Sequence, residues 1–158
     1  MRKSEREIKD MQDIISVMRK CDVCRLALND DGYPYIIPLN FGMTCEDGKI
    51  ELLFHSALEG CKLDLIRRDN RASFEMDCSH QLQYFEDRGY CTFAYESVIG
   101  RGHITILDED AKATALDELM RHYHDGEAAY YTPAALARTT VYKLTVEAIT
   151  GKRKELKK

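Results

Sequence analysis

Residues 33–41 restrict the possible folds of this chain most strongly, because two kinds of side chain alternate along the segment. Aromatic and aliphatic side chains fall on every second residue and would share one face of a strand: Tyr33, Tyr35, Ile37, Leu39 and Phe41. This alternation is typical of a strand with one buried face. Pro38 has no N–H to donate, so it predicts an edge strand or a break in strand pairing. The backbone near Asn40 is then available to something other than a neighbouring strand.

About six segments have the composition of strands, and most are joined by turns of the hairpin type. They cover residues 22–29, 33–41, 50–54, 71–77, 90–107 and 139–149. The fifth is either a pair of strands or one bent strand, because Gly100 and Gly102 interrupt it. The polar residues from Ser79 to Gly89 predict a loop. We therefore expect one domain over residues 1–158, of α+β and mainly β class, built on a small antiparallel barrel with flanking helices.

Helices are expected before and after these strands. Ser4-x-x-Glu7 matches a capping box and predicts an amphipathic helix over residues 5–20. Acidic side chains at residues 108–110 predict the start of another helix, which ends near His124. Residues 125–132 are expected to form a connection.

A strand gives way to a short helix between residues 50 and 68, and this junction is the first candidate for a binding site. The apolar run Ile50–Phe54 is followed by His55, Ser56, a turn of small residues and Lys62. The start of a helix leaves backbone N–H groups unpaired and favours an anion. Ser56 adds a hydroxyl donor and Lys62 a full positive charge. The residues alone suit a phosphate site, and equally an ordinary connection with a surface lysine.

Charge and hydropathy argue against several classes of protein. The 158 residues carry a formal net charge of −4, and the basic residues are scattered apart from the tail Lys152–Lys158. This distribution lacks the basic patch of a nucleic-acid-binding protein. No apolar run approaches the roughly 20 residues of a membrane-spanning helix. Residues 1–7 are not followed by the apolar stretch of a secretory signal. We therefore expect a cytoplasmic protein that binds neither nucleic acid nor membrane.

Six cysteines are present, and free thiols are expected in that compartment. Cys21-x-x-Cys24 has the spacing of a zinc or redox motif, but no second close pair completes a zinc site. The residues that follow instead predict a strand with Cys24, Leu26 and Leu28 on one face, which places Cys24 in the core. The remaining histidines also lack the spacing of metal ligands, so we expect no metal site.

Several stretches, taken in order, match a known family. They are residues 34–41 (PYIIPLNF), 54–57 (FHSA), 59–62 (EGCK), 74–77 (FEMD), 95–102 (YESVIGRG) and 150–153 (TGKR). Together they make the chain resemble the nitroimidazole-resistance (Nim) family within the pyridoxamine 5′-phosphate oxidase-like flavoproteins, over nearly its whole length. The resemblance implies a six-stranded antiparallel split β-barrel. It also implies FMN as cofactor, bound in two equivalent sites at the interface of a homodimer.

The resemblance assigns the junction after residue 54 to the FMN phosphate. Ser56 and Lys62 match the positions that hold the phosphate in the wider family. Cys61 occupies a position that is commonly basic in relatives, so one phosphate contact is expected to be missing. Three basic residues are candidates to compensate: Arg67, Arg68 and Lys152.

Two further segments are assigned by the same resemblance. Residues 38–41 match the segment that lies along the isoalloxazine ring and supplies main-chain contacts to it. Residues 95–102 match the strand that closes the site, often from the partner subunit, although this strand could instead serve dimer packing alone. The candidate cofactor-binding residues are Pro38, Leu39, Asn40, Phe41, Phe54, His55, Ser56, Lys62, Tyr95, Ser97, Val98 and Gly100.

His55 is the candidate catalytic residue, because the matching histidine of Nim-like proteins lies beside the flavin. An imidazole in that place can orient a substrate, donate a hydrogen bond to the flavin or transfer a proton near neutral pH. The alternative is a flavin contact with no catalytic role.

The implied function is that of an FMN-dependent oxidoreductase. It would pass electrons from NADH, NADPH or another donor to a small electrophile such as a nitroaromatic compound. The sequence has no GxGxxG fingerprint, so a nicotinamide is expected to bind only transiently. Two alternatives stay open. One is a non-catalytic FMN-binding dimer, either carrier or sensor, and the other is a split-barrel protein that binds haem or a deazaflavin.

Overall fold

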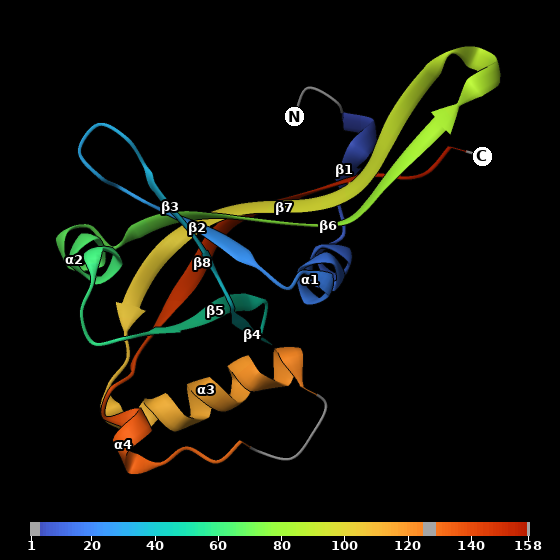
Figure 1. Ribbon diagram of the computed structural model, residues 1–158. Helices are drawn as coiled ribbons and strands as arrows, with labels where there is room; N and C mark the ends of the chain where they lie inside the picture. Colours follow the sequence, from blue (N-terminus) through green and yellow to red (C-terminus); the bar gives the residue numbers. More distant parts are fainter. Residues whose placement is uncertain (1–3, 125–128, 158) are drawn as a thin grey trace.

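Antiparallel pairing builds one curved sheet in the computed structural model, which describes residues 4–124 and 129–157 (Figure 1). The strands are β1 (Glu7–Ile8), β2 (Cys24–Leu28), β3 (Tyr35–Leu39), β4 (Gly42–Glu46), β5 (Lys49–Ser56), β6 (Arg71–Phe85), β7 (Tyr90–Ile106) and β8 (Thr140–Lys154). Their order is β3-β2-β6-β7-β8-β5-β4, with β1 paired to β8.

Helices cover this sheet in separate places. The helices are α1 (Met11–Lys20), α2 (Cys61–Arg68), α3 (Glu109–Tyr123) and α4 (Pro133–Leu136). α3 packs against β4, β5 and β8, and α4 lies beside its first turns (Figure 1). The connection expected at residues 125–132 falls partly on residues 125–128, which lie outside the described residues.

This architecture confirms the α+β, mainly β, fold class and the split barrel. β3 and β4 are consecutive in the chain, yet they form the two ends of the strand order, so the barrel stays open between them. The strand expected over residues 33–41 ends at Leu39, and a separate strand begins at Gly42. With β1, this brings the strands of the described residues to eight. Residues 90–106 form one bent strand, which has a register shift between Arg101 and Gly102.

Alternate residues of the strands fill the barrel interior. The predicted buried face of β2 is confirmed by three side chains with no exposed surface: Cys24, Leu26 and Leu28. On β5, Leu52 and Phe54 join the same core, to which α1 and α2 also contribute. Leu53, on the opposite face of β5, packs with Ala115 and Leu116 of α3 in a second, smaller cluster. The β5 residues that lie between the core residues in sequence therefore face α3.

The capping box predicted at Ser4-x-x-Glu7 is wrong. Residues 7–8 form β1 and pair with the end of β8, so the strand ladder takes residues that the local pattern assigns to a helix. α1 begins instead at Met11. The carboxylate of Asp10 caps it by accepting a hydrogen bond from the Gln12 N–H at 2.7 Å.

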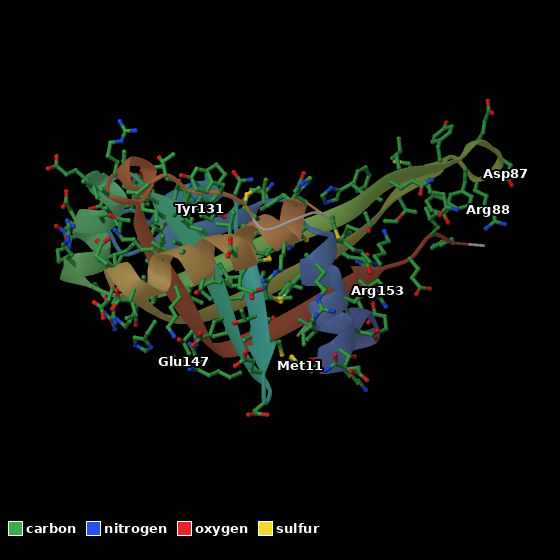
Figure 2. The ribbon with its side chains drawn as sticks, turned by 90° about the horizontal axis from the view of Figure 1, so that it is seen from below. Met11, Asp87, Arg88, Tyr131, Glu147 and Arg153 are labelled. Carbon is green, nitrogen blue, oxygen red and sulfur yellow. The ribbon has the colours of Figure 1, made fainter. Side chains whose placement is uncertain are left out.

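The loop predicted at Ser79–Gly89 is also wrong. β6 and β7 continue through this region as a hairpin that is paired as far as Phe85 and Tyr90. The hairpin projects beyond the body of the molecule, with Asp87 and Arg88 at its tip (Figures 1 and 2). Its large apolar side chains are exposed: Leu82, Tyr84 and Phe93. Because these side chains are exposed, the segment is mostly polar, and the short alternation at residues 81–84 is too brief to distinguish a strand from a loop.

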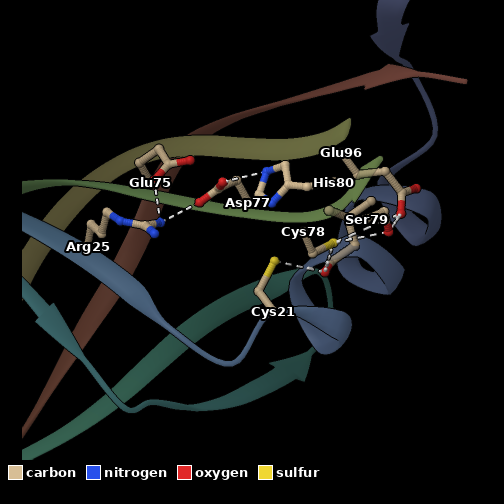
Figure 3. Close-up of polar contacts among 9 residues, drawn as sticks. Cys21, Arg25, Glu75, Asp77, Cys78, Ser79, His80 and Glu96 are labelled. Carbon is tan, nitrogen blue, oxygen red and sulfur yellow. Dashed lines mark hydrogen bonds and ion pairs between the residues drawn. The ribbon is translucent and has the colours of Figure 1, made fainter. Parts of the chain in front are cut away.

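A buried carboxylate, Glu96, holds the base of this hairpin to α1 and β8. Figure 3 shows its contact with Ser79. Its Oε2 accepts hydrogen bonds from Lys20 Nζ and Ser79 Oγ, each at 2.8 Å, and its Oε1 accepts one from Arg153 Nε at 2.6 Å. Burial raises the pKa of this carboxyl, but the three donors outweigh burial and lower the pKa to about 2. The charged form of Glu96 therefore stabilises the fold.

We expect Glu96→Gln to lower the free energy of unfolding at neutral pH by about 2–3 kcal/mol, because the lowered pKa reports a preference for the charged form. The pKa of Glu96 is lowered from 4.5 to about 2 on folding, so this stabilisation is present above pH 4.5 and is lost as pH falls toward 2. Urea unfolding between pH 7 and pH 2 measures the effect, with the exposed Glu86→Gln as control. A Glu96→Gln variant that loses stability in this range in parallel with the wild type would contradict the assignment.

Candidate functional site

The two halves of the predicted site meet where the barrel is split. β4 pairs with β5, with Gly42 opposite Leu53. Continuing this register would place Asn40 opposite His55, but the preceding strand β3 pairs with β2 instead. Residues 39–42, between the part of the chain that pairs with β2 and the part that pairs with β5, form what we call the β3–β4 corner.

Pro38 explains why β3 has an open edge at this corner. Pro38 lies opposite Arg25 in the β2–β3 ladder, and because it has no N–H, its nitrogen faces away from β2. Backbone groups of alternate residues face the same side of a strand, so Asn40 also turns its backbone away from β2. Within the described residues β3 has no strand on that side. The predicted edge position of Pro38 is confirmed, and the backbone of Asn40 faces the gap between β3 and the end of β5.

Exposure separates the candidate residues of this gap into two groups. Phe41 and Phe54 are fully buried and form part of the core beneath the gap. The side chains of the others reach the surface fully or in part: Pro38, Leu39, Asn40, His55 and Ser56. The corner and the end of β5 thus combine an apolar floor with polar groups at the opening.

The start of α2 provides an opening suited to an anion. Gly60 is the N-cap residue, with φ of 142°, and has no side chain to cap the first N–H groups. A Cβ atom at Gly60 would meet no other atom within 4 Å, so the space beside it is open. The first N–H groups of a helix have no acceptor within the helix, and they can bind an anion placed in such a space.

Ser56 and Lys62 flank this opening, and with the first turn of α2 they form what we call the anion cradle. Ser56 ends β5, and Lys62 is in the first turn of α2. The Ser56 hydroxyl donates to the Ala57 carbonyl at 2.9 Å, a local bond that it can exchange for an anion. Ser56 and Lys62 thus lie on either side of the strand-to-helix junction, and their binding of a phosphate stays a prediction.

His55 lies between the corner and the cradle. It is exposed and, by strand alternation, shares the α3-facing side of β5 with Leu53. Desolvation of its ring by neighbouring atoms and then the positive charge of Lys62 lower the pKa of the imidazole. His55 is therefore neutral at neutral pH, with one nitrogen that donates a hydrogen bond and one that accepts.

The basic residues considered as substitutes at Cys61 have partners elsewhere. Arg67 and Arg68 each pair with an aspartate at 3.1 Å. The Nζ atom of Lys152 lies 5.7 Å from the ring centre of Tyr95, near the far end of β8. An anion in the cradle would therefore depend on Lys62, Ser56 and the helix N–H groups.

The predicted closing strand lies at the opposite end of the sheet from the cradle. Ser56 is opposite Thr140 at the start of β8, whereas Ser97 is opposite Lys152 near its end. At about 3.3 Å per residue, the stretch of β8 between these partners spans up to roughly 40 Å. Tyr95 and Ser97 therefore do not reach the cradle of their own chain.

Two other residues of that strand face the core. Val98 is fully buried. A Cβ atom on Gly100 would lie 2.3 Å from the ring of Phe74, so packing alone requires glycine at this position. Val98 and Gly100 are both buried and are paired with β6 on one side and β8 on the other, so neither presents a side chain to a ligand.

Two hollows of the surface lie away from the corner and the cradle. One of about 380 Å³ crosses β2, β6, β7 and β8, and its polar lining includes Arg71, Arg101 and His103. Another of about 430 Å³ lies beside Tyr95 and Glu96 at the base of the projecting hairpin. Neither contains a residue of the corner or the cradle.

Sequence reasoning missed two residues next to the corner, His122 and Tyr123 at the end of α3. The Tyr123 hydroxyl accepts a hydrogen bond from the Phe41 N–H at 2.9 Å. The His122 ring lies against Phe41, with ring centres 4.3 Å apart. No local signal marks this contact, because Tyr123 and Phe41 are 82 residues apart in the chain.

Within residues 4–124 and 129–157, no group of three or more His, Cys, Asp or Glu side chains is arranged to hold a metal ion. The same residues include no helix that is long and apolar enough to cross a membrane. All six cysteines are free thiols.

Comparison with known proteins identifies the family. Residues 10–153 match the pyridoxamine 5′-phosphate oxidase family. A similar solved structure is that of a candidate 5-nitroimidazole antibiotic resistance protein from Bacteroides thetaiotaomicron VPI-5482. It is 32% identical, the match covers 93% of this chain and 86% of that chain, and the TM-score is 0.81. The chain therefore belongs to the pyridoxamine 5′-phosphate oxidase family, and its resemblance to nitroimidazole-resistance proteins is confirmed.

Two more distant structures share the fold. An FAD and heme binding protein from Mycobacterium smegmatis is 22% identical, with coverage of 96% of this chain and 74% of that chain and a TM-score of 0.79. A flavocytochrome from Azotobacter vinelandii is 15% identical, with coverage of 99% and 72% and a TM-score of 0.81. At these identities the likeness concerns the fold alone. No curated protein sequence matches the chain.

Removing the charge of Lys62 should raise the pKa of His55, because Lys62 disfavours a second positive charge beside it. We expect the imidazole of Lys62→Ala to titrate at higher pH than that of the wild type in the protein without added ligand. NMR titration of the His55 ring protons measures this, with Lys49→Ala at the other end of β5 as the control. Identical titration curves for wild type and Lys62→Ala would show that Lys62 does not act on His55.

Proposed function

We propose that this chain is an FMN-binding flavoprotein that acts as an FMN-dependent oxidoreductase of the nitroimidazole reductase type on a small electrophile. One observation carries the proposal: the open gap at the β3–β4 corner adjoins an anion cradle at the start of α2. Membership of the pyridoxamine 5′-phosphate oxidase family supports a flavin, as does the 32% identical resistance protein. The two distant structures named for FAD or as a flavocytochrome agree with this.

The residues present fit the parts of FMN. A flat ring with polar edges suits the gap, where the backbone of Asn40 faces outward and Pro38 donates nothing to compete. A terminal phosphate suits the cradle, where Lys62 and the helix N–H groups supply positive potential. The open space beside Gly60 leaves room for the phosphate oxygens. FMN in this place would supply two-electron redox chemistry, while the chain binds and orients it.

The role proposed for His55 follows from its place between corner and cradle. Because its pKa is lowered, the imidazole is neutral and can hold a substrate by a hydrogen bond at neutral pH. When it is protonated, the ring can also deliver a proton to a reduced substrate oxygen or nitrogen.

A homodimer completes the proposed site. Tyr95 and Ser97 cannot reach the cradle of their own chain, so a second copy is the source from which they would close it. Large apolar side chains on the outer face of the sheet support such a contact, since Ile36 is 62% and Ile99 57% exposed.

The absorbance spectrum of the purified protein, followed by anaerobic addition of NADH or NADPH, tests the function. We expect flavin absorbance that bleaches on reduction and recovers when a nitroaromatic compound is added. Bound flavin that no common donor bleaches would favour a carrier or sensor, and a Soret band would favour haem.

Lys62→Ala should weaken FMN binding about 10- to 100-fold, because a charge-assisted phosphate contact contributes roughly 1.5–3 kcal/mol. Fluorescence titration of the flavin-free protein with FMN measures this. Lys49→Ala is the matched control, since it removes the same charge at the other end of β5. Equal FMN affinity for wild type and Lys62→Ala would show that the phosphate binds elsewhere.

His55→Ala distinguishes a chemical role from a binding role. We expect this variant to retain FMN and to lose most of its turnover, because the neutral imidazole is removed while the cradle stays intact. Steady-state rates of NADH oxidation, measured at equal flavin occupancy, report the difference. Unchanged turnover would reduce His55 to a flavin contact.

A further inference from the structure

A hydroxyl group in the last turn of α3 makes the first of three contacts with the β3–β4 corner. Tyr123 Oη accepts a hydrogen bond from the Phe41 N–H at 2.9 Å and donates one to the Asp22 carbonyl at 2.9 Å. The hydroxyl therefore uses its donor and an acceptor position at once. It links the corner to the turn that precedes β2.

The neighbouring residue of α3 makes a second link between the same two segments. His122 Nε2 donates a hydrogen bond to the Cys21 carbonyl at 2.7 Å. Its ring packs on Phe41 with ring centres 4.3 Å apart, and on Tyr123 with centres 4.8 Å apart. His122 and Tyr123 thus bind the 21–22 turn with their polar atoms and hold Phe41 between them and the core.

A close backbone approach adds a third point of contact. A Cβ atom on Gly42 would lie 2.5 Å from Leu119 Cα and 2.7 Å from its nitrogen. Such a distance is impossible for a real side chain, so α3 rests directly on the backbone of the corner. The helix therefore controls the position of residues 41 and 42 without intervening side chains that could adjust.

The Tyr123 hydroxyl supplies an acceptor for a buried backbone N–H of the corner. Phe41 is fully buried, and a buried N–H left without an acceptor costs about 1–3 kcal/mol. Continuing the β4–β5 ladder past Gly42 would draw Asn40 against His55 and close the gap. Tyr123 satisfies the Phe41 N–H while the corner remains turned away from β5.

We propose that Tyr123 and His122 are positioning residues of the flavin site, which keep the gap open by holding Phe41 so that the backbone of Asn40 faces the isoalloxazine ring. This inference rests on the proposed function, because it assigns the gap to FMN. It predicts that α3 controls how the chain contacts the ring, although no atom of α3 belongs to the corner or the cradle.

Tyr123→Phe tests the inference, because it removes the hydroxyl and keeps the ring. The matched control is Tyr131→Phe, since the Tyr131 hydroxyl is buried without a hydrogen-bond partner among the described residues. In the flavin-free proteins, we expect amide exchange at Phe41 to rise at least tenfold in Tyr123→Phe only. We expect its FMN dissociation constant to rise about 5- to 30-fold, while Tyr131→Phe matches the wild type.

The spectrum of the bound flavin distinguishes a role of Tyr123 in positioning the corner from a general loss of stability. At saturating FMN, the visible absorbance maxima and midpoint potential of the flavin in Tyr123→Phe should differ from those of the wild type, because the main-chain contacts of the ring have moved. If Tyr123→Phe does not fold, His122→Leu and His122→Gln replace it. The leucine variant should show the same changes, and the glutamine variant, which keeps an N–H donor, should show smaller ones.

The outcomes are distinct. A wild type that binds no FMN overturns the proposed function and this inference together. A wild type that binds FMN, beside a Tyr123→Phe variant with unchanged affinity, spectrum and potential, overturns the inference alone and leaves the proposed function standing.

Discussion

The loss of pairing between β3 and β5 at Asn40 is the constraint on which the rest of the site depends. β4 pairs with β5 in regular register. Pro38, two residues before Asn40, has no N–H to donate, and β3 pairs with β2 instead. Two consecutive strands thus become the opposite ends of one sheet. In the described part of the chain, the open side of β3 faces this gap without a strand partner, which is the setting in which a ring with polar edges can take the place of a strand.

Charge and helix packing then give this gap its two ends. At one end, Lys62 and the first turn of α2 offer positive potential next to a neutral His55. At the other, α3 holds the corner through Tyr123 and through its contact with Gly42. The Glu96 network acts elsewhere, at the base of the projecting hairpin, where it fixes the part of β7 that carries Tyr95 and Ser97.

Burial determined which features could be predicted from the sequence. The alternation on β2 and the edge position of Pro38 were predictable, because a strand with one buried face leaves a pattern of period two. The hairpin over residues 79–89 was not, because both of its faces are exposed. Ser4-x-x-Glu7 gave a wrong prediction of a helix start, because residues 7–8 pair with β8 and this pairing overrides the local helix signal. The role of Tyr123 could not be predicted, because its partner Phe41 is distant in sequence and the contact exists only in the folded chain.

Chemical-shift mapping of the ¹⁵N-labelled, flavin-free protein during titration with FMN tests the central claim most directly. The account predicts that the largest shifts fall on the β3–β4 corner at residues 39–42 and on residues 55–62, with a smaller set at Tyr95 and Ser97 from the second copy. Shifts confined to the hollow beside Arg71 and Arg101, or no shifts at all, would contradict it.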